Sequence, residues 1–453
     1  MGIVNTVASK TCRSTELLLL TGAIAIVLLA YANVGLAISG SLPVDLVTLG
    51  GGFTVVALAF HLVLWWKAPY ADPMLLPIVT LLNGLGLVMV HRIDLASGDQ
   101  HAAPRQLMWT AVGVIAAVAL LCLVSDHRRL RRYTFSFGLA SFVLLLTPLL
   151  PVIGRNVNGS RVWIGIGSFS FQPSEVAKLL ITIFFASYLV QTRDALSLVG
   201  RRVLGLPLPR ARDMGSIMIV WLASLGVLVF ESDLGTSLLF FGLFVAMLYV
   251  ATERRSWIII GLLLFLAGSC TAYLLFAHFQ ERVSLWLNPF QPGLSDQIAK
   301  GLMGMAAGGI FGTGLGQGHP ELTYYANSDF IIPSFGEELG LIGLCAILLL
   351  YGLVIERGLR TGIACRDSGG KLLATGLAFS MALQVFIVVG GVTCVIPLTG
   401  LTSPFLSAGG SSLLANWVLA AVLLRISDQA RRPAIEERVE KLDSDNTQVV
   451  KVR

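Results

Sequence analysis

The sequence contains few charged residues for its length. Only 13% of its 453 residues are Asp, Glu, Lys or Arg, whereas 55% are hydrophobic and the mean hydropathy is +0.79. Soluble domains carry about 25% charged residues. This shortage excludes a water-soluble globular protein, a coiled coil, a disordered chain and a basic nucleic-acid-binding domain. We therefore predict an integral membrane protein, in which the net charge of +6 comes from basic loop residues and not from binding to nucleic acid.

Metal and nucleotide motifs are also lacking. The six cysteines and six histidines are scattered, without CxxC or HExxH, so neither a disulfide framework nor a zinc site is predicted. The glycine-rich stretch 308–318 lacks the GK[ST] of a phosphate loop and follows no predicted strand. We expect its glycines to allow a tight re-entrant backbone.

Long apolar runs are abundant. A membrane-spanning helix needs about 20 apolar residues, and the period-2 alternation of an outer-membrane barrel is not seen. The sequence predicts an all-α polytopic membrane protein with about twelve transmembrane helices, at 16–38, 44–66, 73–91, 106–124, 133–153, 173–192, 214–230, 234–251, 257–277, 331–355, 372–396 and 405–426.

The distribution of Lys and Arg predicts the orientation. With the N-terminus inside, the inner side receives 25 of the 32 Lys and Arg residues and the outer loops receive six. This bias places both termini in the cytoplasm. Two outer segments, 154–172 and 278–330, exceed the usual length of a connection and are expected to carry function. The composition of residues 428–453 predicts a charged cytoplasmic tail.

Ionisable residues within predicted helices need a partner or a function, because they cost about 2.5–3.5 kcal/mol each on insertion scales. Glu175 and Lys178 share one helix face just after Pro173, and their spacing predicts an ion pair. The pair is equally compatible with a structural role and with a role in a cavity.

Three further acidic sites lie near the predicted outer membrane surface. Asp233 precedes an apolar helix, where its position is typical of an N-cap, and a second role facing a cavity stays open. Asp329 lies where the long outer loop meets a helix, and partial burial there would raise its pKa and suit a general base. Helix capping is the alternative for Asp329. Glu337 and Glu338 follow one to two turns deeper, without a basic residue before Arg357.

Two other segments are candidates for contacts with an anionic or sugar ligand. Arg161 and Trp163 place a cation and an aromatic ring together at the outer interface, where Trp residues are common. Together with Arg155, they could also hold a diphosphate head group. The small residues around Ser407, at 403–412, favour helix packing over ligand contact.

Taken in order, these segments resemble the SEDS family (shape, elongation, division and sporulation). The matching pieces are Asn158-Gly159 through Arg161 and Trp163, the run Phe171–Glu175 with Lys178, Asp233-Leu234-Gly235-Thr236, the glycines of 308–318, Asp329-Phe330-Ile331 with Glu337–Gly340, and Pro404-Phe405 with Ser407 and 409–412. The resemblance runs from about 73 to 427. It divides the chain into an N-terminal segment with two extra helices (1–72), a SEDS-like core (73–427) and the tail (428–453).

The resemblance implies a peptidoglycan glycosyltransferase of the bacterial cytoplasmic membrane. Such a protein polymerises lipid II on the outer face and works with a class B penicillin-binding protein, so lipid II, the growing glycan strand and membrane lipid are the implied partners. The family's essential acidic residue corresponds to Asp329, the expected catalytic residue. The expected residues of the substrate cavity are Arg155, Arg161, Trp163, Glu175, Lys178, Asp233, Glu337, Glu338 and Ser407.

Several points stay open at this level. The sequence defines no metal ligands and no cofactor, and a divalent cation (Mg or Mn) that assists the diphosphate is left open. The size and short tail favour the RodA-like elongation branch over the FtsW-like division branch. The rival functions are a lipid II flippase and a non-catalytic scaffold for the penicillin-binding protein. This chain departs from the family at Glu231-Ser232, Asn327-Ser328, Pro333 and Ala408.

Overall fold

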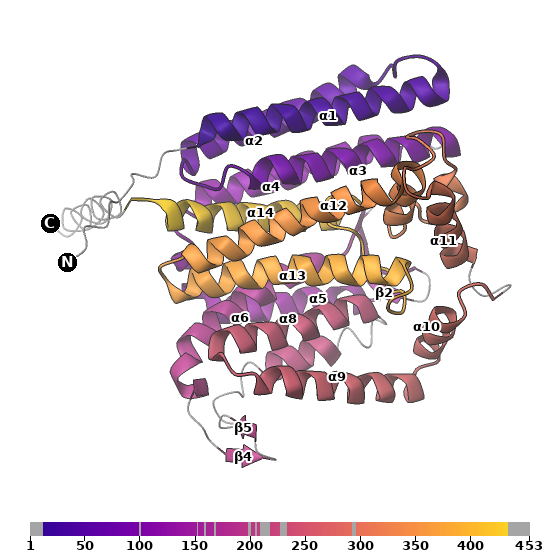
Figure 1. Cartoon of the computed structure of the whole chain (residues 1–453). Helices are drawn as coiled ribbons and strands as arrows, with labels where there is room; N and C mark the ends of the chain where they lie inside the picture. Colours follow the sequence, from indigo (N-terminus) through magenta and orange to yellow (C-terminus); the bar gives the residue numbers. More distant parts are fainter. Residues whose placement is uncertain are drawn as a thin grey trace.

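The computed structural model describes residues 12–98, 101–151, 153–157, 160–166, 169–197, 201–203, 206–208, 218–226, 233–291 and 296–433. Long apolar helices lie side by side and form one bundle, from α1 and α2 at one edge to α9 at the other (Figure 1). The longer helices are α1 (Arg13–Ser39), α2 (Gly51–Lys67), α3 (Leu75–Ser97), α4 (Ala102–Leu123), α5 (Thr134–Leu146), α6 (Pro173–Ser197), α8 (Leu234–Thr252), α9 (Ser256–Leu275), α12 (Ile331–Ala364), α13 (Ser368–Val392) and α14 (Gly410–Arg431).

Shorter elements connect these helices. They are η1 (Leu46–Gly50), η2 (His127–Tyr133), η3 (Thr147–Leu149), the strands β1 (Gly154–Val157), β2 (Ser160–Ile166) and β3 (Phe169–Phe171), the hairpin β4 (Arg201–Val203) and β5 (Leu206–Leu208), α10 (Ala277–Leu287), α11 (Asp296–Gly308) and η4 (Pro320–Leu322). Strands β1, β2 and β3 form an antiparallel sheet in that order, in which Arg155 pairs with Trp163 and Ile164 with Phe171.

Eleven helical segments within the described residues are long and apolar enough to cross a membrane. They confirm eleven of the twelve predicted spans. The twelfth, at 214–230, is helical over 218–226, and its flanks lie outside the described residues. In the span Ser256–Leu275 (α9), only 6% of the most apolar stretch is buried, because α9 contacts the rest of the described protein mainly through α8 and α10. Such exposure of apolar side chains is expected for a helix that faces lipid.

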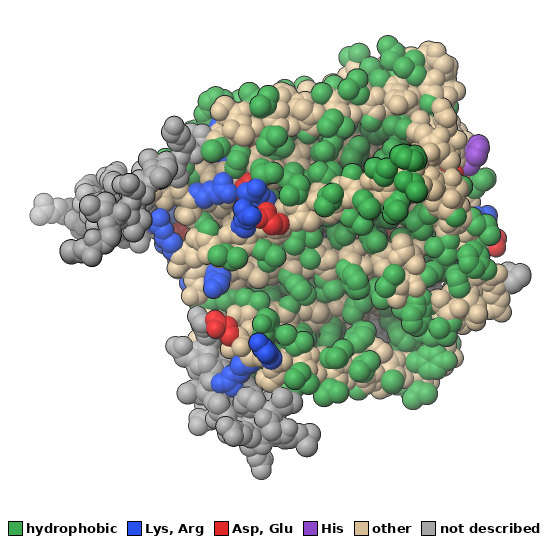
Figure 2. All heavy atoms as spheres, in the orientation of Figure 1, with side chains coloured by type: hydrophobic (Ala, Val, Ile, Leu, Met, Phe, Trp, Pro, Cys, Tyr) green, Lys and Arg blue, Asp and Glu red, His purple; other side chains and the backbone are tan. Residues whose placement is uncertain are grey.

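The two ends of the bundle differ in structure and charge. One end, which we call the outer end, carries α10, α11 and the sheet β1–β3; the opposite, inner end carries η2 and the hairpin β4–β5 (Figure 1). Most Lys and Arg side chains on the face shown in Figure 2 gather toward the inner end, and apolar side chains cover the middle. This asymmetry agrees with the predicted placement of the inner end in the cytoplasm.

Helix boundaries follow from a few residues. Pro173 starts α6, where its missing N–H costs nothing. Asp233 caps α8, and Asp367 caps α13 by accepting the Gly370 amide at 2.8 Å. Gly40 adopts a left-handed conformation and ends α1.

Two predicted boundaries were wrong. The last helix begins at Gly410 and not at 405, because Phe405 has a positive φ of 65° and residues 403–408 form hydrogen bonds within the loop and to residues 327–328. Arg92, predicted in an outer loop, lies within α3 and is buried, because α3 continues to Ser97. The long segment 278–330 is largely structured, with α10, α11 and η4.

Candidate active site at the outer end

Asp329 lies two residues before α12 in a backbone that is held on both sides. The Phe330 amide donates to the Tyr325 carbonyl at 3.1 Å. The Ser407 hydroxyl donates to the Ser328 carbonyl at 2.6 Å, and the Ala408 amide donates to the Asn327 carbonyl at 2.8 Å. The N-cap of α12 is Phe330, without a side-chain cap, so helix capping does not explain Asp329. The loop therefore fixes the position of this carboxylate and leaves it available to other groups.

The Asp329 carboxyl is half-buried and has a perturbed acidity. Burial raises its pKa to about 7, although the nearby Arg282 guanidinium and the hydrogen bond with Ser328 act in the opposite direction. A Cβ placed on Gly400 would lie 3.7 Å from Asp329 Oδ2, so the glycine leaves space beside the carboxylate. A carboxylate with a pKa near neutral pH is suited to accept a proton.

Arg282 of α10 is a residue of this site that sequence reasoning did not select. Its guanidinium interacts electrostatically with both Asp329 and Asp233, and its Nη1 donates to the Leu398 carbonyl at 2.8 Å. On the same helix, Trp286 Nε1 donates to the Cys394 carbonyl at 2.9 Å. These two bonds hold α10 against the segment after α13. A lone Arg in a loop gave no signal in the sequence, because its acidic neighbours are distant along the chain.

Asp233 combines capping with a place in this site. Its Oδ1 accepts the Thr236 amide at 2.9 Å, as the N-cap prediction requires. Its Oδ2 makes no hydrogen bond within the described residues and is buried. Burial raises the pKa of the Asp233 carboxyl, and Arg282 opposes that rise. The preceding departure from the family, Glu231-Ser232, lies outside the described residues.

A buried polar network lies beneath these residues. Lys178 Nζ contacts Glu175 Oε2 at 2.8 Å, which confirms the predicted ion pair, and donates to Gln384 Oε1 at 2.7 Å. Gln384 in turn donates to the Thr402 carbonyl at 3.0 Å. Glu175 and Asp233 also interact electrostatically. The network therefore connects α6 and α13 with the loop at 401–409, and Gln384 and Thr402 are members that the sequence pattern did not single out.

The glycine segment (residues 308–318) fills a break in α12. Gly340 has φ 65° and ψ −169°, so α12 consists of a half-helix, 331–339, and a longer second part. The carbonyls of Glu337 and Glu338 accept the amides of Thr313 and Gly314, each at 3.0 Å. A Cβ on Gly312 would lie 2.6 Å from the Glu338 carbonyl carbon, so only glycine permits this approach. The glycines therefore allow a tight backbone turn, as the sequence predicted.

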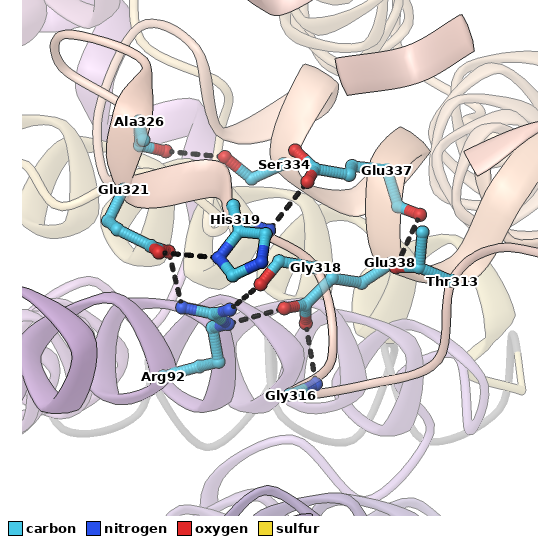
Figure 3. Close-up of polar contacts among 10 residues, drawn as sticks. All are labelled: Arg92, Thr313, Gly316, Gly318, His319, Glu321, Ala326, Ser334, Glu337 and Glu338. Atoms are coloured by element: carbon cyan, nitrogen blue, oxygen red, sulfur yellow. Dashed lines mark hydrogen bonds and ion pairs between the residues drawn. The ribbon is translucent and has the colours of Figure 1, made fainter. Parts of the chain in front are cut away.

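Arg92 and Glu338 connect this segment to α3 (Figure 3). Both side chains are buried, and Arg92 Nε bonds to Glu338 Oε1. Glu338 Oε2 accepts the Gly316 amide at 3.0 Å, and Arg92 Nη1 contacts Glu321 Oε2 at 2.8 Å. The Arg92 guanidinium also donates to the Gly318 carbonyl. Arg92 of α3 therefore supplies the positive charge that pairs with Glu338, because α12 itself contains no basic residue before Arg357.

Glu337 also binds this part of the chain. Its Oε1 accepts the His319 amide at 2.6 Å (Figure 3). Glu337 and Glu338 thus direct their carboxylates to the glycine segment and the residues that follow it, whereas Asp329, Asp233, Glu175 and Lys178 form the second group described above. The structure separates the predicted acidic residues into two clusters.

The basic residues of the first outer segment lie on the sheet β1–β3. Arg155 on β1 is exposed and its side chain lies across Gly165, while Arg161 on β2 is exposed and Trp163 is half-buried. The sheet contacts η3 and α6. The part of the family motif at Asn158-Gly159 lies outside the described residues.

Among the described residues, no group of three or more His, Cys, Asp or Glu side chains is arranged to hold a metal ion. Arg282 and Lys178 supply positive charge near the acidic residues of the site. Within the described part of the chain, the acidic residues therefore do not form a metal site built from protein ligands.

Comparison with known proteins identifies the family. A family model described as cell cycle protein, FtsW/RodA/SpoVE, matches residues 73–432. The peptidoglycan glycosyltransferase RodA of Mycobacterium tuberculosis is 50% identical over 431 residues, covering 93% of this chain and 92% of the relative. Stage V sporulation protein E of Bacillus subtilis is 34% identical, covering 81% of this chain and 99% of the relative.

Solved structures share the fold. A chain from a study titled "Structural coordination of polymerization and crosslinking by a peptidoglycan synthase complex" matches with a TM-score of 0.65 and 27% identity, over 80% of this chain and 98% of that chain. The rod shape determining protein RodA of Thermus thermophilus matches with a TM-score of 0.57 and 25% identity, over 79% and 96% of the two chains. The 50% identity to RodA, against 34% to stage V sporulation protein E, favours the RodA branch. The chain belongs to the FtsW/RodA/SpoVE family of cell cycle proteins.

Proposed function

We propose that this protein is a peptidoglycan glycosyltransferase that polymerises lipid II into glycan strands on the outer face of the bacterial cytoplasmic membrane. The single observation that carries the proposal is Asp329, a half-buried carboxylate with a pKa of about 7 at the outer end of a membrane bundle. The relatives that share 50% of the sequence are named peptidoglycan glycosyltransferases, and this agreement supports the same activity here.

In the proposed reaction, Asp329 accepts the proton of the 4-hydroxyl group of the acceptor GlcNAc. The hydroxyl oxygen attacks the anomeric carbon of the donor MurNAc, and the bond from that carbon to undecaprenyl diphosphate breaks. The diphosphate leaves with the bonding electron pair, and the α linkage is inverted to β. The proton on Asp329 then passes to solvent. General-base catalysis of this kind contributes about 10²–10⁴-fold.

Positive residues at the outer end have the chemistry to stabilise the departing diphosphate. Arg155 and Arg161 are exposed on the sheet, and Arg282 lies beside Asp329 and Asp233. Guanidinium groups bind phosphate oxygens with two parallel hydrogen bonds. We assign to Arg282 the further role of keeping Asp329 ionised, since its charge favours the carboxylate form.

We propose a class B penicillin-binding protein as the partner, which would cross-link the strands that this protein polymerises. The support is the match to a chain of a peptidoglycan synthase complex that couples polymerisation with crosslinking. Elongation of the cell wall is the process favoured by the 50% identity to RodA proteins.

The test is polymerisation of labelled lipid II by the purified protein together with its penicillin-binding partner, whose transpeptidase is blocked by a β-lactam. Wild-type protein is expected to make long glycan chains, and Asp329→Asn or Asp329→Ala should make them at least about 10²-fold more slowly. The partner alone is the control for its own polymerase activity. Full polymerisation by Asp329→Asn would refute the general-base assignment. Absence of chains from folded wild-type protein would favour a flippase or a scaffold, which lipid II transport in vesicles would then separate.

A further inference from the structure

Helix α1 lies outside the part of the chain that the family model matches. The match begins at residue 73, whereas α1 and α2 occupy residues 13–67. The mycobacterial relatives nevertheless share part of this region, because an alignment that covers 93% of the chain is longer than residues 73–453. Part of the region before residue 73 is therefore shared with these relatives.

Helix α1 packs along α3 (Figure 1), the helix that carries Arg92. Val27 of α1 fills the space beside Gly84 of α3, where a Cβ would meet Val27 Cγ1 at 2.8 Å. Nearer the outer end, the Tyr31 ring stacks on the ring of His91 at 4.4 Å between centroids. His91 directly precedes Arg92, so α1 packs against the stretch of α3 that carries the cation of the network in Figure 3.

The last turns of α1 also contact the glycine segment. A Cβ placed on Gly316 would lie 2.9 Å from Ala37 Cβ and 3.6 Å from Val34 Cα. Val34 is fully buried at this contact. Gly316 has a φ of +85°, and its amide donates to Glu338 Oε2 at 3.0 Å. The segment is therefore enclosed between α1 on one side and the Glu338 carboxylate on the other.

Glu338 belongs to the half-helix 331–339, which begins two residues after Asp329. Regular helix bonding is interrupted at the far end of this half-helix, and the amides of Thr313 and Gly314 bond to the carbonyls of Glu337 and Glu338 there. The Arg92–Glu338 pair holds the same end from α3. A shift of Gly316 would move Glu338 and, through the two turns of the half-helix, Asp329.

We propose that α1 is a positioning helix for the active site. Its last two turns pack against the glycine segment and keep it in the break of α12. This packing fixes the half-helix 331–339, which begins two residues after Asp329. The proposal rests on the proposed function for its activity readout, but the contact itself is tested by a readout that needs no substrate. Val34, Ala37 and Gly316 are the positioning residues.

The first experiment compares two glycines of the same segment. Gly316 and Gly314 both have positive φ, at 85° and 108°, so alanine strains the backbone at either position. Only Gly316 faces α1, since a Cβ on Gly314 would meet only the Gln317 side chain, at 3.4 Å. We expect Gly316→Ala to reduce the kcat of lipid II polymerisation at least tenfold more than Gly314→Ala. Adding Ala37→Gly should restore a large part of the loss in Gly316→Ala and none in Gly314→Ala.

The second experiment leaves the glycine segment unchanged. Val34→Ala shortens the fully buried side chain of a residue whose Cα would lie 3.6 Å from a Cβ on Gly316, and Val27→Ala makes the same change two turns away on the same face of α1. Both variants should lose similar thermal stability. Only Val34→Ala should speed hydrogen exchange of the Thr313, Gly314 and Gly316 amides, and only Val34→Ala should lower kcat.

The outcomes separate the two proposals. Equal exchange at these amides in Val34→Ala and Val27→Ala, together with no rescue by Ala37→Gly, would overturn the positioning role of α1. If wild-type protein does not polymerise lipid II while the exchange difference is present, the proposed function fails and the contact stands. If Gly316→Ala does not fold, the exchange difference between the two valine variants decides.

Discussion

Two clusters at the outer end of the bundle each combine carboxylates with an arginine, but the carboxylates of the two clusters are bonded differently. In the first, Arg92 and Glu338 are buried and bonded to each other, and Glu338 also accepts a backbone amide. In the second, Arg282 interacts electrostatically with both Asp233 and Asp329, and burial raises the Asp329 pKa to about 7. A carboxylate with its oxygens bonded holds the chain in place, whereas a desolvated carboxylate whose position comes from its backbone is free to take a proton.

This contrast assigns different roles to residues that look alike in the sequence. Glu337 and Glu338 stand eight and nine residues after Asp329, in the same apolar context. The structure uses the two glutamates to bind the glycine segment and its neighbours, and it leaves Asp329 beside a glycine at position 400. Four measurements would show whether the two clusters differ in function as they differ in bonding.

The largest expected effect is a difference in polymerisation rate between variants of the two clusters. Asp329→Asn keeps the size of the side chain and removes the base, so polymerisation should fall by about 10²-fold or more. Glu321→Gln keeps the acceptor for Arg92 and removes one charge, so it should change the rate by only a few fold. The rates of chain formation from labelled lipid II, measured with both variants at equal amounts of folded protein, check this. Equal losses in the two variants would remove the distinction.

Next in size is a loss of stability in the first cluster. Arg92→Met leaves the Glu338 carboxylate buried without its cation, and breaking such a buried pair costs about 3–5 kcal/mol. We expect a much lower unfolding temperature in detergent. Arg360→Met is the matched control, because Arg360 is 68% exposed and its pair with Glu356 contributes little. An Arg92→Met protein as stable as this control would contradict the bonded role of the first cluster.

A smaller effect concerns the pH dependence of the rate. Wild-type activity should fall as the pH drops through about 7, because Asp329 becomes protonated and cannot act as a base. Arg282 favours the ionised form, so Arg282→Gln should move this acid limb to higher pH by about one unit, the scale of a neighbouring charge. Profiles of kcat between pH 5 and pH 9, with Arg282→Lys as the charge-preserving control, measure the shift. A limb at the same pH in all three proteins would show that Asp329 does not set it.

The smallest effect is on stability through Asp329 itself. Its pKa is raised in the folded state, so ionisation of the carboxyl opposes folding, and the native state loses stability as the pH rises through about 7. Asp329→Asn removes this loss. The variant should unfold at a higher temperature than wild type above pH 7, and the difference should vanish below pH 4. A constant difference across this range would indicate a packing effect without titration.

Much of the fold and part of the site followed from local sequence. Apolar runs predicted the spans because a helix in lipid must satisfy its own backbone and present apolar side chains. The spacing of Glu175 and Lys178 predicted their ion pair, since i, i+3 residues share a helix face. The N-cap at Asp233 followed for the same reason, because capping is decided within four residues.

Other features depended on residues far apart in the chain. Arg92 is 246 residues from Glu338, and neither sequence neighbourhood indicates the other. Arg282 looked like an ordinary outer-loop cation until α10 was placed over the residues after α13. The break in α12 at Gly340 was missed because its sequence reads as one apolar helix, and only the glycine segment, by donating amides to Glu337 and Glu338, makes the interruption stable.

By itself, the sequence determined that the chain is a membrane-spanning helical bundle with an ionisable outer end, because hydropathy and charge bias act through composition and short-range spacing. It also identified Asp329 as the residue most suited to chemistry. Only the tertiary structure decided which carboxylates are bonded and which is left to titrate, since burial and partners are set by contacts between helices that are hundreds of residues apart.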